Sequence, residues 1–198
     1  MTETPVADQG DARGPRERMV ISAADLIGRD GVSATSIGDV LAASKAPRGS
    51  IYHHFPRGKS ELMVEAVRYA GEFIARRIAG RRTDSPAETV ADIGAVWRRM
   101  LIDSDFQFGC PVLAGGLARN AEPAVADEAQ EIFAEWTALI TNRLADDGVP
   151  RERAQSLAIL SISAIEGAVG LCQTQRRVTP LDDVIVELQA LCESAVAT

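Results

Sequence analysis

The sequence has few of the residues that most catalytic, metal and disulfide sites require. Its 198 residues include two histidines, two tyrosines and three cysteines. The cysteines Cys110, Cys172 and Cys192 are odd in number and widely spaced, which favours unpaired, buried thiols in a reducing compartment. No pair of cysteines or histidines has the spacing of zinc ligands. We therefore expect no catalytic residues, no metal site and no cofactor.

Aromatic residues are also scarce, at 5% of the chain. Ala, Leu, Ile and Val carry most of the apolar content, which favours helices over strands. We find no convincing strand, no internal repeat, no signal peptide and no long apolar run. The composition therefore predicts an all-α, cytoplasmic protein that does not enter a membrane. A hydrophobic content of 46% is enough for a full core.

Charge is distributed unevenly. The chain as a whole carries −7, which is not typical of a nucleic-acid-binding protein. Residues 13–59, however, hold eight Lys/Arg against four Asp/Glu, a balance of +4. Residues 60–198 hold thirteen against twenty-one, a balance of −8. A basic head on an acidic body is what a DNA-binding domain joined to a separate second domain would show.

Apolar periodicity and capping signals predict about nine helices. Ser36 with Asp39, Ser85 with Glu88, and Thr179 with Asp182 each have capping-box spacing. The expected helices cover about 15–29, 35–42, 47–53, 59–80, 85–103, a short segment before 119–120, 123–144, 151–173 and 181–196. We expect three domains or segments: a disordered tail (1–12), a DNA-binding domain (13–58) and an effector-binding and dimerisation domain (59–198).

Residues 35–59 have the pattern of a helix-turn-helix. Two short helical segments flank Ala42–Lys45, where Ala or Ser is expected to make a turn that contains no glycine. Pro47 suits the first position of the second helix because its missing N–H has no partner there. The two lysines of the protein, Lys45 and Lys59, bracket the cluster formed by residues 52–55. A helix of about two turns fits the major groove, where its N-terminal residues reach base edges.

Each residue of this segment has more than one interpretation. Arg48 is suited to guanine or to a phosphate, Gly49 permits close backbone approach, and Ser50 suits either kind of contact. Tyr52 is suited to phosphate or to the core, whereas Phe55 and His54 are better suited to packing. The full set of predicted DNA contacts is Thr35, Lys45, Arg48, Gly49, Ser50, Tyr52, His53 and Lys59.

Residues 19–62 resemble the TetR family of bacterial transcriptional repressors. The resemblance rests on Thr35-Ser36-Ile37, Asp39-Val40-Leu41, the string from Arg48 to Pro56, Gly58-Lys59 and Leu62. Residues 108–113, Phe-Gly-Cys-Pro-Val-Leu, are similar to the LmrA/YxaF multidrug-type branch. The resemblance implies that Tyr52, His53 and Lys59 grip the DNA backbone. It also implies that an effector displaces the helix beginning at Lys59 and changes the separation of two DNA-binding heads.

The remaining helices suggest a sensor and a dimer. Segments 151–173 and 181–196 carry more apolar surface than one subunit needs, which predicts a homodimer with a near-palindromic operator. The alternative is that they only complete the core of one chain. The five expected helices from the one that begins at Lys59 to the segment 151–173 would enclose a cavity for a small hydrophobic effector. The predicted ligand contacts are Trp97, Phe106, Phe108, Leu113, Leu117, Asn120, Phe133, Trp136 and Glu166. Glu166 could instead be a dimer contact.

The sequence thus predicts a DNA-binding repressor that an effector releases. A DNA-binding protein that needs no ligand is the main alternative, and an activator is another. An enzyme is disfavoured because both histidines lie in the DNA-reading segment and no phosphate-binding glycine loop or nucleophile motif is present. The identity of the effector, the operator and the regulated genes do not follow from the sequence.

Overall fold

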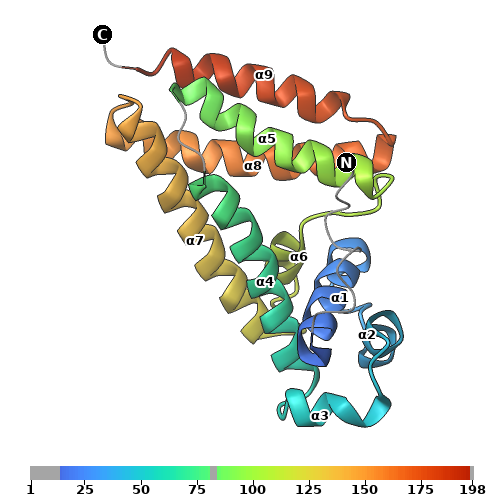
Figure 1. Cartoon of the computed structure of the whole chain (residues 1–198). Coiled ribbons are helices and arrows are strands. Elements are labelled where there is room, and N and C mark those ends of the chain that lie inside the picture. The colour runs from blue at the N-terminus through green and yellow to red at the C-terminus, as the bar shows by residue number, and fades with distance from the viewer. Residues whose placement is uncertain (1–13, 81–83, 197–198) are drawn as a thin grey trace. The chain divides into compact units, whose positions relative to one another are not determined.

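The computed structural model describes residues 14–80 and 84–196, and within these ranges it is entirely helical (Figure 1). The predicted tail, 1–12, lies outside the described residues. The described part contains nine α-helices and one 3-10 turn, η1, and no strand. Their bounds are α1 Pro15–Asp30, α2 Ile37–Ser44, η1 Arg48–Ser50, α3 Ile51–His54, α4 Lys59–Ala79, α5 Pro86–Asp103, α6 Pro111–Leu117, α7 Pro123–Asp146, α8 Arg151–Gln175 and α9 Thr179–Glu193.

The chain forms two compact units. Unit 1 comprises residues 1–72 and 110–132, and unit 2 comprises residues 73–109 and 133–198. Helices α4 and α7 each run from one unit into the other. By their contacts, the first part of α4, α6 and the first part of α7 group with the N-terminal helices. The division into a DNA-binding domain, 13–58, and an effector-binding and dimerisation domain, 59–198, stays a prediction.

Unit 1 is built on α1, which packs against α2 and α6. Its fully buried side chains include Met19, Ile27, Ile51 and Phe55. The helices α4 and α7 approach closely at Gly71, where an added Cβ would lie 2.7 Å from the side chain of Ile132. Burial of these large apolar groups supplies the main stabilisation of the unit.

Local signals set the start and the end of α2. The Ser36 hydroxyl accepts a hydrogen bond from the Asp39 N–H, and the Asp39 carboxylate accepts one from the Ser36 N–H, which confirms the predicted capping box. The helix ends at Lys45, which is left-handed with φ 53°. The expectation that Ala or Ser would make this turn was therefore wrong. The turn positions Lys45 at an exposed site directly before the next helical segment.

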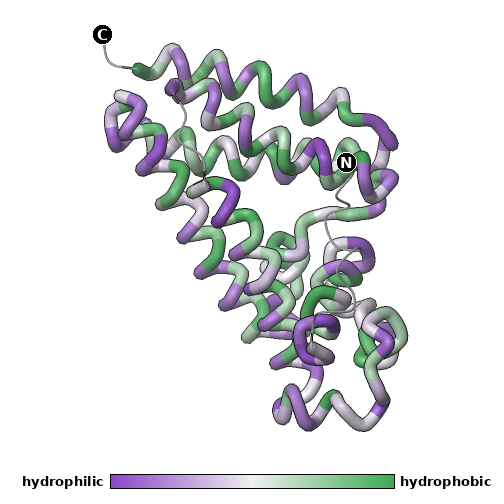
Figure 2. The backbone as a smooth tube through the Cα atoms, viewed as in Figure 1, coloured by the Kyte–Doolittle hydropathy of each residue, from purple (hydrophilic) through white to green (hydrophobic). Residues whose placement is uncertain are grey.

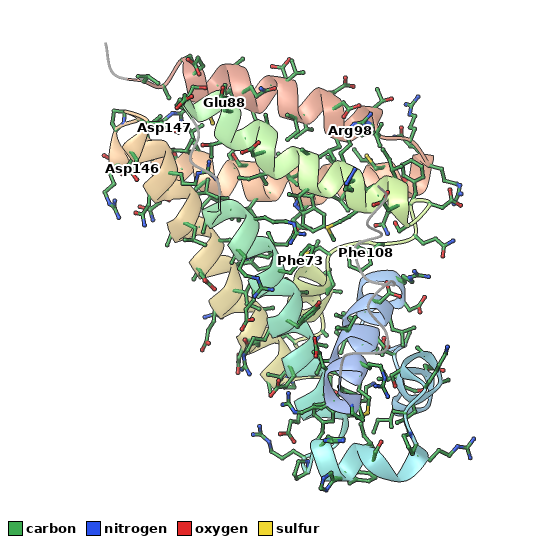
Figure 3. The ribbon with its side chains drawn as sticks, in the orientation of Figure 1. Phe73, Glu88, Arg98, Phe108, Asp146 and Asp147 are labelled. Atoms are coloured by element: carbon green, nitrogen blue, oxygen red, sulfur yellow. The ribbon has the colours of Figure 1, made fainter. Side chains whose placement is uncertain are left out.

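Unit 2 places α5, α8 and α9 side by side (Figure 1). The helix α5 approaches α9 most closely at Gly94, where an added Cβ would lie 2.5 Å from the side chain of Ile185. Arg98 of α5 (labelled in Figure 3) pairs with Asp182 of α9, with 3.0 Å between Nε and Oδ1. Small residues at the crossing thus allow close packing, and an ion pair bridges the same two helices.

Two helix starts differ from the sequence interpretation. The segment predicted to begin as a helix at Pro47 is first a 3-10 turn, and the α-helix α3 begins only at Ile51. The predicted capping box at Thr179 is absent, because α9 already includes Thr179 and its N-cap is Val178. Asp182, the expected partner of Thr179, instead binds Arg98. The Ser85 cap of α5 is present, and its hydroxyl accepts from the Glu88 N–H.

Helix α8 is long and apolar enough, by length and composition, to cross a membrane. The expectation of no long apolar run was therefore wrong. A core helix of a soluble protein meets the same criterion, and 44% of the apolar window of α8 is buried. In the neighbouring α9, hydrophobic and polar residues alternate along the helix (Figure 2).

Candidate functional site

The recognition segment, residues 45–59, is anchored by two buried apolar side chains. Ile51 is 2% exposed and Phe55 is fully buried. The Phe55 N–H donates to the Ile51 carbonyl at 2.8 Å and closes the single turn of α3. The prediction that Phe55 packs in the core is confirmed. Because both anchors are buried, Tyr52 and His53, which lie between them, are left exposed to solvent.

The first half of the segment presents small and basic groups. Lys45, Arg48 and Gly49 are exposed, and a Cβ added at Gly49 would meet no atom within 4 Å. The Ser50 hydroxyl donates to the Pro47 carbonyl at 2.7 Å, which leaves its oxygen lone pairs as acceptors. The surface around η1 is therefore open to close approach by another molecule.

The second half presents Tyr52 and His53. Tyr52 is 66% exposed, so its ring is not a core residue. The ring lies against Gly58, where an added Cβ would be 3.6 Å from the Tyr52 ring. Gly58 itself has φ 70°, a conformation that favours glycine. His53 is exposed, while His54 is half-buried and meets the His53 ring edge-on at 5.0 Å between centroids.

Helix α4 begins at Lys59, so the positive end of its dipole follows Tyr52 closely in the sequence. The side chain of Glu61 accepts the Arg57 N–H at 2.9 Å, and Arg57 is itself 82% exposed. Arg57 is not among the DNA contacts predicted from the sequence. Its exposure between Tyr52 and Lys59 makes it a further candidate for contact with an anion.

Thr35 does not fit its predicted role. The side chain is 2% exposed, and its hydroxyl donates to the Gly31 carbonyl at 2.9 Å. A buried hydroxyl that is already hydrogen-bonded to the backbone cannot reach a phosphate in this conformation. Ser36, rather than Thr35, caps the following helix.

Arg18 supports the turn from the side of α1. Its Nε donates to the Ser44 carbonyl at 3.2 Å, across 26 residues of sequence. This bond satisfies one of the carbonyls that an α-helix leaves without a partner at its C-terminal end. It fixes the end of α2 directly before the left-handed Lys45. No short-range signal in the sequence points to it.

Six of the nine predicted ligand contacts lie in unit 2. Trp97 and Trp136 are each 3% exposed, and the ring of Phe133 meets Trp136 edge-on at 5.4 Å between centroids. Phe106 and Phe108 are half-buried in the loop after α5. Glu166 is half-buried on α8, and its Oε2 atom is shielded from solvent. These side chains provide a largely apolar interior with one carboxylate.

A small hollow in unit 2 includes one of these residues, Trp97. The other lining residues come from α4 and α5: Ile74, Arg77, Ile78, Asp92, Ile93 and Val96. Its empty volume of about 200 Å³ includes open solvent at its mouth, so the enclosed space is much smaller than that of a drug-sized ligand pocket. The Arg77 guanidinium lies 3.4 Å from the centroid of the Phe73 ring (Phe73 is labelled in Figure 3).

The three remaining ligand candidates lie in unit 1. The Leu113 N–H donates to the Cys110 sulfur at 3.4 Å and belongs to the start of α6. Leu117 is 79% exposed, and Asn120 is also exposed. Such exposure does not fit the wall of an enclosed pocket, so Leu117 and Asn120 are removed from the ligand candidates.

The helices α8 and α9 expose a set of large apolar side chains. These are Ile159, Leu160, Leu171, Val186, Leu191 and Val196, the last just beyond the end of α9. Between the first two and Leu171, α8 is exposed at Gly167 and Gly170, where an added Cβ would meet no atom within 4 Å. This α8/α9 face thus combines apolar bulk with a shallow stretch of small residues.

The cysteines are buried free thiols, as expected. Burial raises the pKa of the Cys172 thiol and of the Cys192 thiol, which keeps both in the unreactive protonated form. Among the described residues, no group of three or more His, Cys, Asp or Glu side chains is placed to hold a metal ion.

Two family models match the chain. The model described as "Bacterial regulatory proteins, tetR family" matches residues 21–66, and "Transcriptional regulator LmrA/YxaF-like, C-terminal domain" matches residues 86–187. The first spans the recognition segment, and the second spans α5, α6, α7, α8 and most of α9. Both agree with the resemblance drawn from the sequence.

Curated relatives cover almost the whole chain. The uncharacterised HTH-type transcriptional regulator Rv0196 of Mycobacterium tuberculosis is 42% identical over 186 residues, which cover 90% of this chain and 94% of that protein. The uncharacterised HTH-type transcriptional regulator YxaF of Bacillus subtilis is 32% identical over 180 residues, 89% of this chain and 92% of that one. These relatives are transcriptional regulators and not enzymes.

The fold matches solved structures as well. A TetR transcriptional regulator from Legionella pneumophila superimposes with a TM-score of 0.80 at 23% identity, over 91% of this chain and 98% of that chain. At this identity the likeness establishes the fold alone. The all-helical architecture with an N-terminal helix-turn-helix is therefore confirmed.

Proposed function

The chain belongs to the TetR family of DNA-binding transcriptional regulators, and from that premise we propose that it is a repressor released from a palindromic operator by a small hydrophobic effector. TetR-family regulators bind operator DNA and dimerise. The observation that carries the proposal is the recognition segment, where Ile51 and Phe55 are buried and the intervening Tyr52 and His53 are exposed. Its residues divide into a reading group and an anchoring group.

The reading group is Arg48, Gly49 and Ser50. They form η1, and the exposure of Arg48 and Gly49 supports direct contact with base edges in the major groove, while Ser50 is half-buried. Arg48 has the fork of donors that binds guanine in a bidentate manner. Gly49 adds no side chain that would hold the backbone away from the DNA.

The anchoring group is Lys45, Tyr52, His53 and Lys59, to which we add Arg57. Each carries a hydrogen-bond donor, and Lys59 adds its charge to the N-terminal end of α4. Phosphate contacts fix the register of a protein on DNA without reading its sequence. Because the whole chain carries a net charge of −7, we assign phosphate binding to the locally basic surface.

A homodimer would cover the α8/α9 face. The exposed apolar side chains of α8 and α9 support pairing of two copies into a four-helix interface, close to the predicted segments 151–173 and 181–196. Covering this face with a second copy would also account for the membrane-like composition of α8 in a cytoplasmic protein. Two-fold symmetry would then present two recognition segments to successive major grooves.

The effector is proposed to enter unit 2 near its buried aromatic residues. Trp97, Phe133 and Trp136 supply apolar surface, and Glu166 supplies a carboxylate that suits a cationic group. The effector needs to bind the released state only modestly more tightly than the DNA-bound state, which corresponds to about 1–3 kcal/mol of coupling free energy. A thermal-shift screen with hydrophobic and cationic compounds tests this step, and a ligand-independent DNA-binding protein is the alternative if none binds.

A selection experiment tests the function directly. Double-stranded DNA selected from a random pool by the wild-type protein is expected to contain a near-palindrome. Its affinity should fall steeply with salt, because each neutralised phosphate contributes about −0.9 to the slope of log K against log salt. A pool that yields no shared sequence, together with binding that does not depend on salt, would reject the proposed function.

A further inference from the structure

Four charged side chains in unit 1 form a continuous chain of ion pairs across three helices. Arg16 of α1 lies 2.9 Å from Glu65 of α4, measured from Nη2 to Oε1. The same Glu65 oxygen lies 3.9 Å from Nη1 of Arg68. Arg68 in turn binds Glu128 of α7. We call these four residues the Arg16–Glu128 chain.

One end of this chain touches the recognition segment. The Arg16 guanidinium lies over the ring of Phe55, 5.1 Å from its centroid. Phe55 is fully buried and follows directly on α3. A cation held over an aromatic face is attracted by the ring and covers it. Arg16 therefore helps to hold α3 in position, although it does not itself belong to the exposed DNA-facing surface of residues 45–59.

At the centre, Arg68 contacts two carboxylates unequally. It binds Glu128 in a bidentate manner, with 2.9 Å from Nε to Oε1 and 2.6 Å from Nη2 to Oε2. Its approach to Glu65 is longer, at 3.9 Å. The hydrogen bonds to Glu128 are the largest cause of a raised Arg68 pKa, with further contributions from Glu65 and Glu72. Arg68 is therefore bound mainly to Glu128, and Glu65 is bound mainly to Arg16.

We propose that Arg16 is a positioning residue for the recognition segment and that Arg68 controls it by its choice of partner. While Glu128 holds Arg68, Glu65 holds Arg16 over Phe55. If Glu128 withdraws, Arg68 turns to Glu65 and competes with Arg16, so that Phe55 loses its cover. Helix α7 thereby acts on the recognition segment through α4. This inference rests on the proposed function, because it describes how operator affinity is set.

Two variants that break the same ion pair distinguish this control of Arg16 by Arg68 from a simple structural role. Both Glu128→Gln and Arg68→Gln remove the Arg68–Glu128 pair. In Glu128→Gln, Arg68 is left to compete for Glu65, and the dissociation constant for the selected operator duplex is expected to rise about three- to tenfold, the scale of a partly exposed ion pair. In Arg68→Gln, Glu65 is left to Arg16 alone, and the affinity is expected to stay within about twofold of wild type.

Long-range electrostatics predicts the reverse order. Glu128→Gln makes the protein more positive and should strengthen DNA binding, whereas Arg68→Gln makes it more negative and should weaken binding. Glu131→Gln, an exposed position on the same helix, is the matched control for the change of charge. Its affinity is expected to equal or slightly exceed that of wild type.

The double variant Glu128→Gln/Arg68→Gln is the control for misfolding. It leaves neither the Arg68 charge nor the half-buried Glu128 carboxylate without a partner. The double variant is expected to bind the operator like Arg68→Gln, which would show that Arg68 must be present for the loss in Glu128→Gln. Arg16→Gln is expected to weaken binding at least as much as Glu128→Gln, and combining these two substitutions should add little further loss.

Fluorescence anisotropy with the selected operator duplex is the measurement, and thermal unfolding reports the stability of each variant. Equal affinities of Glu128→Gln and Arg68→Gln, or weaker binding by Arg68→Gln, would overturn the proposal. If the wild-type protein selects no operator, the proposed function fails. If wild type binds normally and only the order of the variants differs, the positioning role alone fails.

Discussion

The recognition segment and the α8/α9 face are two exposed surfaces of this protein with opposite chemistry. Over buried Ile51 and Phe55, the recognition segment exposes basic and hydroxyl-bearing side chains. The α8/α9 face exposes leucine, isoleucine and valine, with Val186 at 62%. The first surface is complementary to a polyanion, and the second to another apolar surface.

The difference shows that net charge and mean composition do not describe either surface. The acidic chain keeps a basic patch at one place, and the apolar helix α8 leaves part of its apolar surface uncovered. Polar contacts with DNA are weakened by salt, whereas apolar burial is not. The two surfaces should therefore respond differently to the same perturbations, and four variants test this.

The largest effect is expected from Gly167→Arg on α8. An exposed glycine with open space around it can take a side chain without disturbing the subunit, but a charge there would oppose pairing with a second copy. Loss of the second head should lower operator affinity about a hundredfold or more. Sedimentation and anisotropy measure the two consequences.

Ala95→Arg, at an exposed position of α5, is the matched control for Gly167→Arg. It adds the same charge to unit 2 and should leave both mass and affinity unchanged. If Gly167→Arg remained dimeric, Gly167 would not lie in the interface. A monomeric wild-type protein would exclude the dimer altogether.

The next effect is expected from Arg48→Ala in the recognition segment. A bidentate contact to guanine contributes about 1–3 kcal/mol of discrimination. The variant should therefore lose affinity for the selected operator and much less for a duplex with the guanines replaced. Competition binding with both duplexes measures the ratio. Equal losses on the two duplexes would make Arg48 a phosphate contact.

Lys59→Ala should weaken binding to every DNA sequence and reduce the salt slope by about 0.9. The reason is the loss of one phosphate contact at the N-terminal end of α4, with no loss of base reading. Binding isotherms across a range of salt concentrations give the slope. Arg99→Ala, at an exposed position of α5, removes the same charge and is expected to leave the slope unaltered.

The smallest effect concerns the capping box that begins α2. Hydrogen bonds from the Ser36 side chain and backbone lower the pKa of Asp39 below its ordinary 3.8. A carboxylate with a lowered pKa in the folded state contributes stability that is present above pH 3.8 and is lost as the pH falls through the folded value. Thermal unfolding of wild type and Asp39→Ala should differ slightly at neutral pH and converge in acid. A difference in unfolding temperature that stays constant across this pH range would show that the lowered Asp39 pKa does not contribute to stability.

Much of the recognition segment was predictable because its signals are local. The Ser36–Asp39 cap, the burial of Ile51 and Phe55 and the exposure of Arg48 each follow from residues close in sequence. Other details were not predictable. Thr35 is buried, with its hydroxyl bonded to the Gly31 carbonyl, and α9 already includes Thr179, so that Val178 is its N-cap. Asp182 instead binds Arg98, 84 residues away in sequence.

The sequence by itself determined the helical class, the place of the helix-turn-helix and the segments rich in apolar surface. These depend on periodicity, on capping residues and on composition, all of which act within a few turns of a helix. Only the tertiary structure decided which carboxylate each arginine binds. The pairing of Arg68 with Glu128 and of Arg16 with Glu65 joins residues far apart in the chain, and no short-range rule selects one partner over another. Packing brings α1, α4 and α7 together in unit 1 and thereby makes that choice.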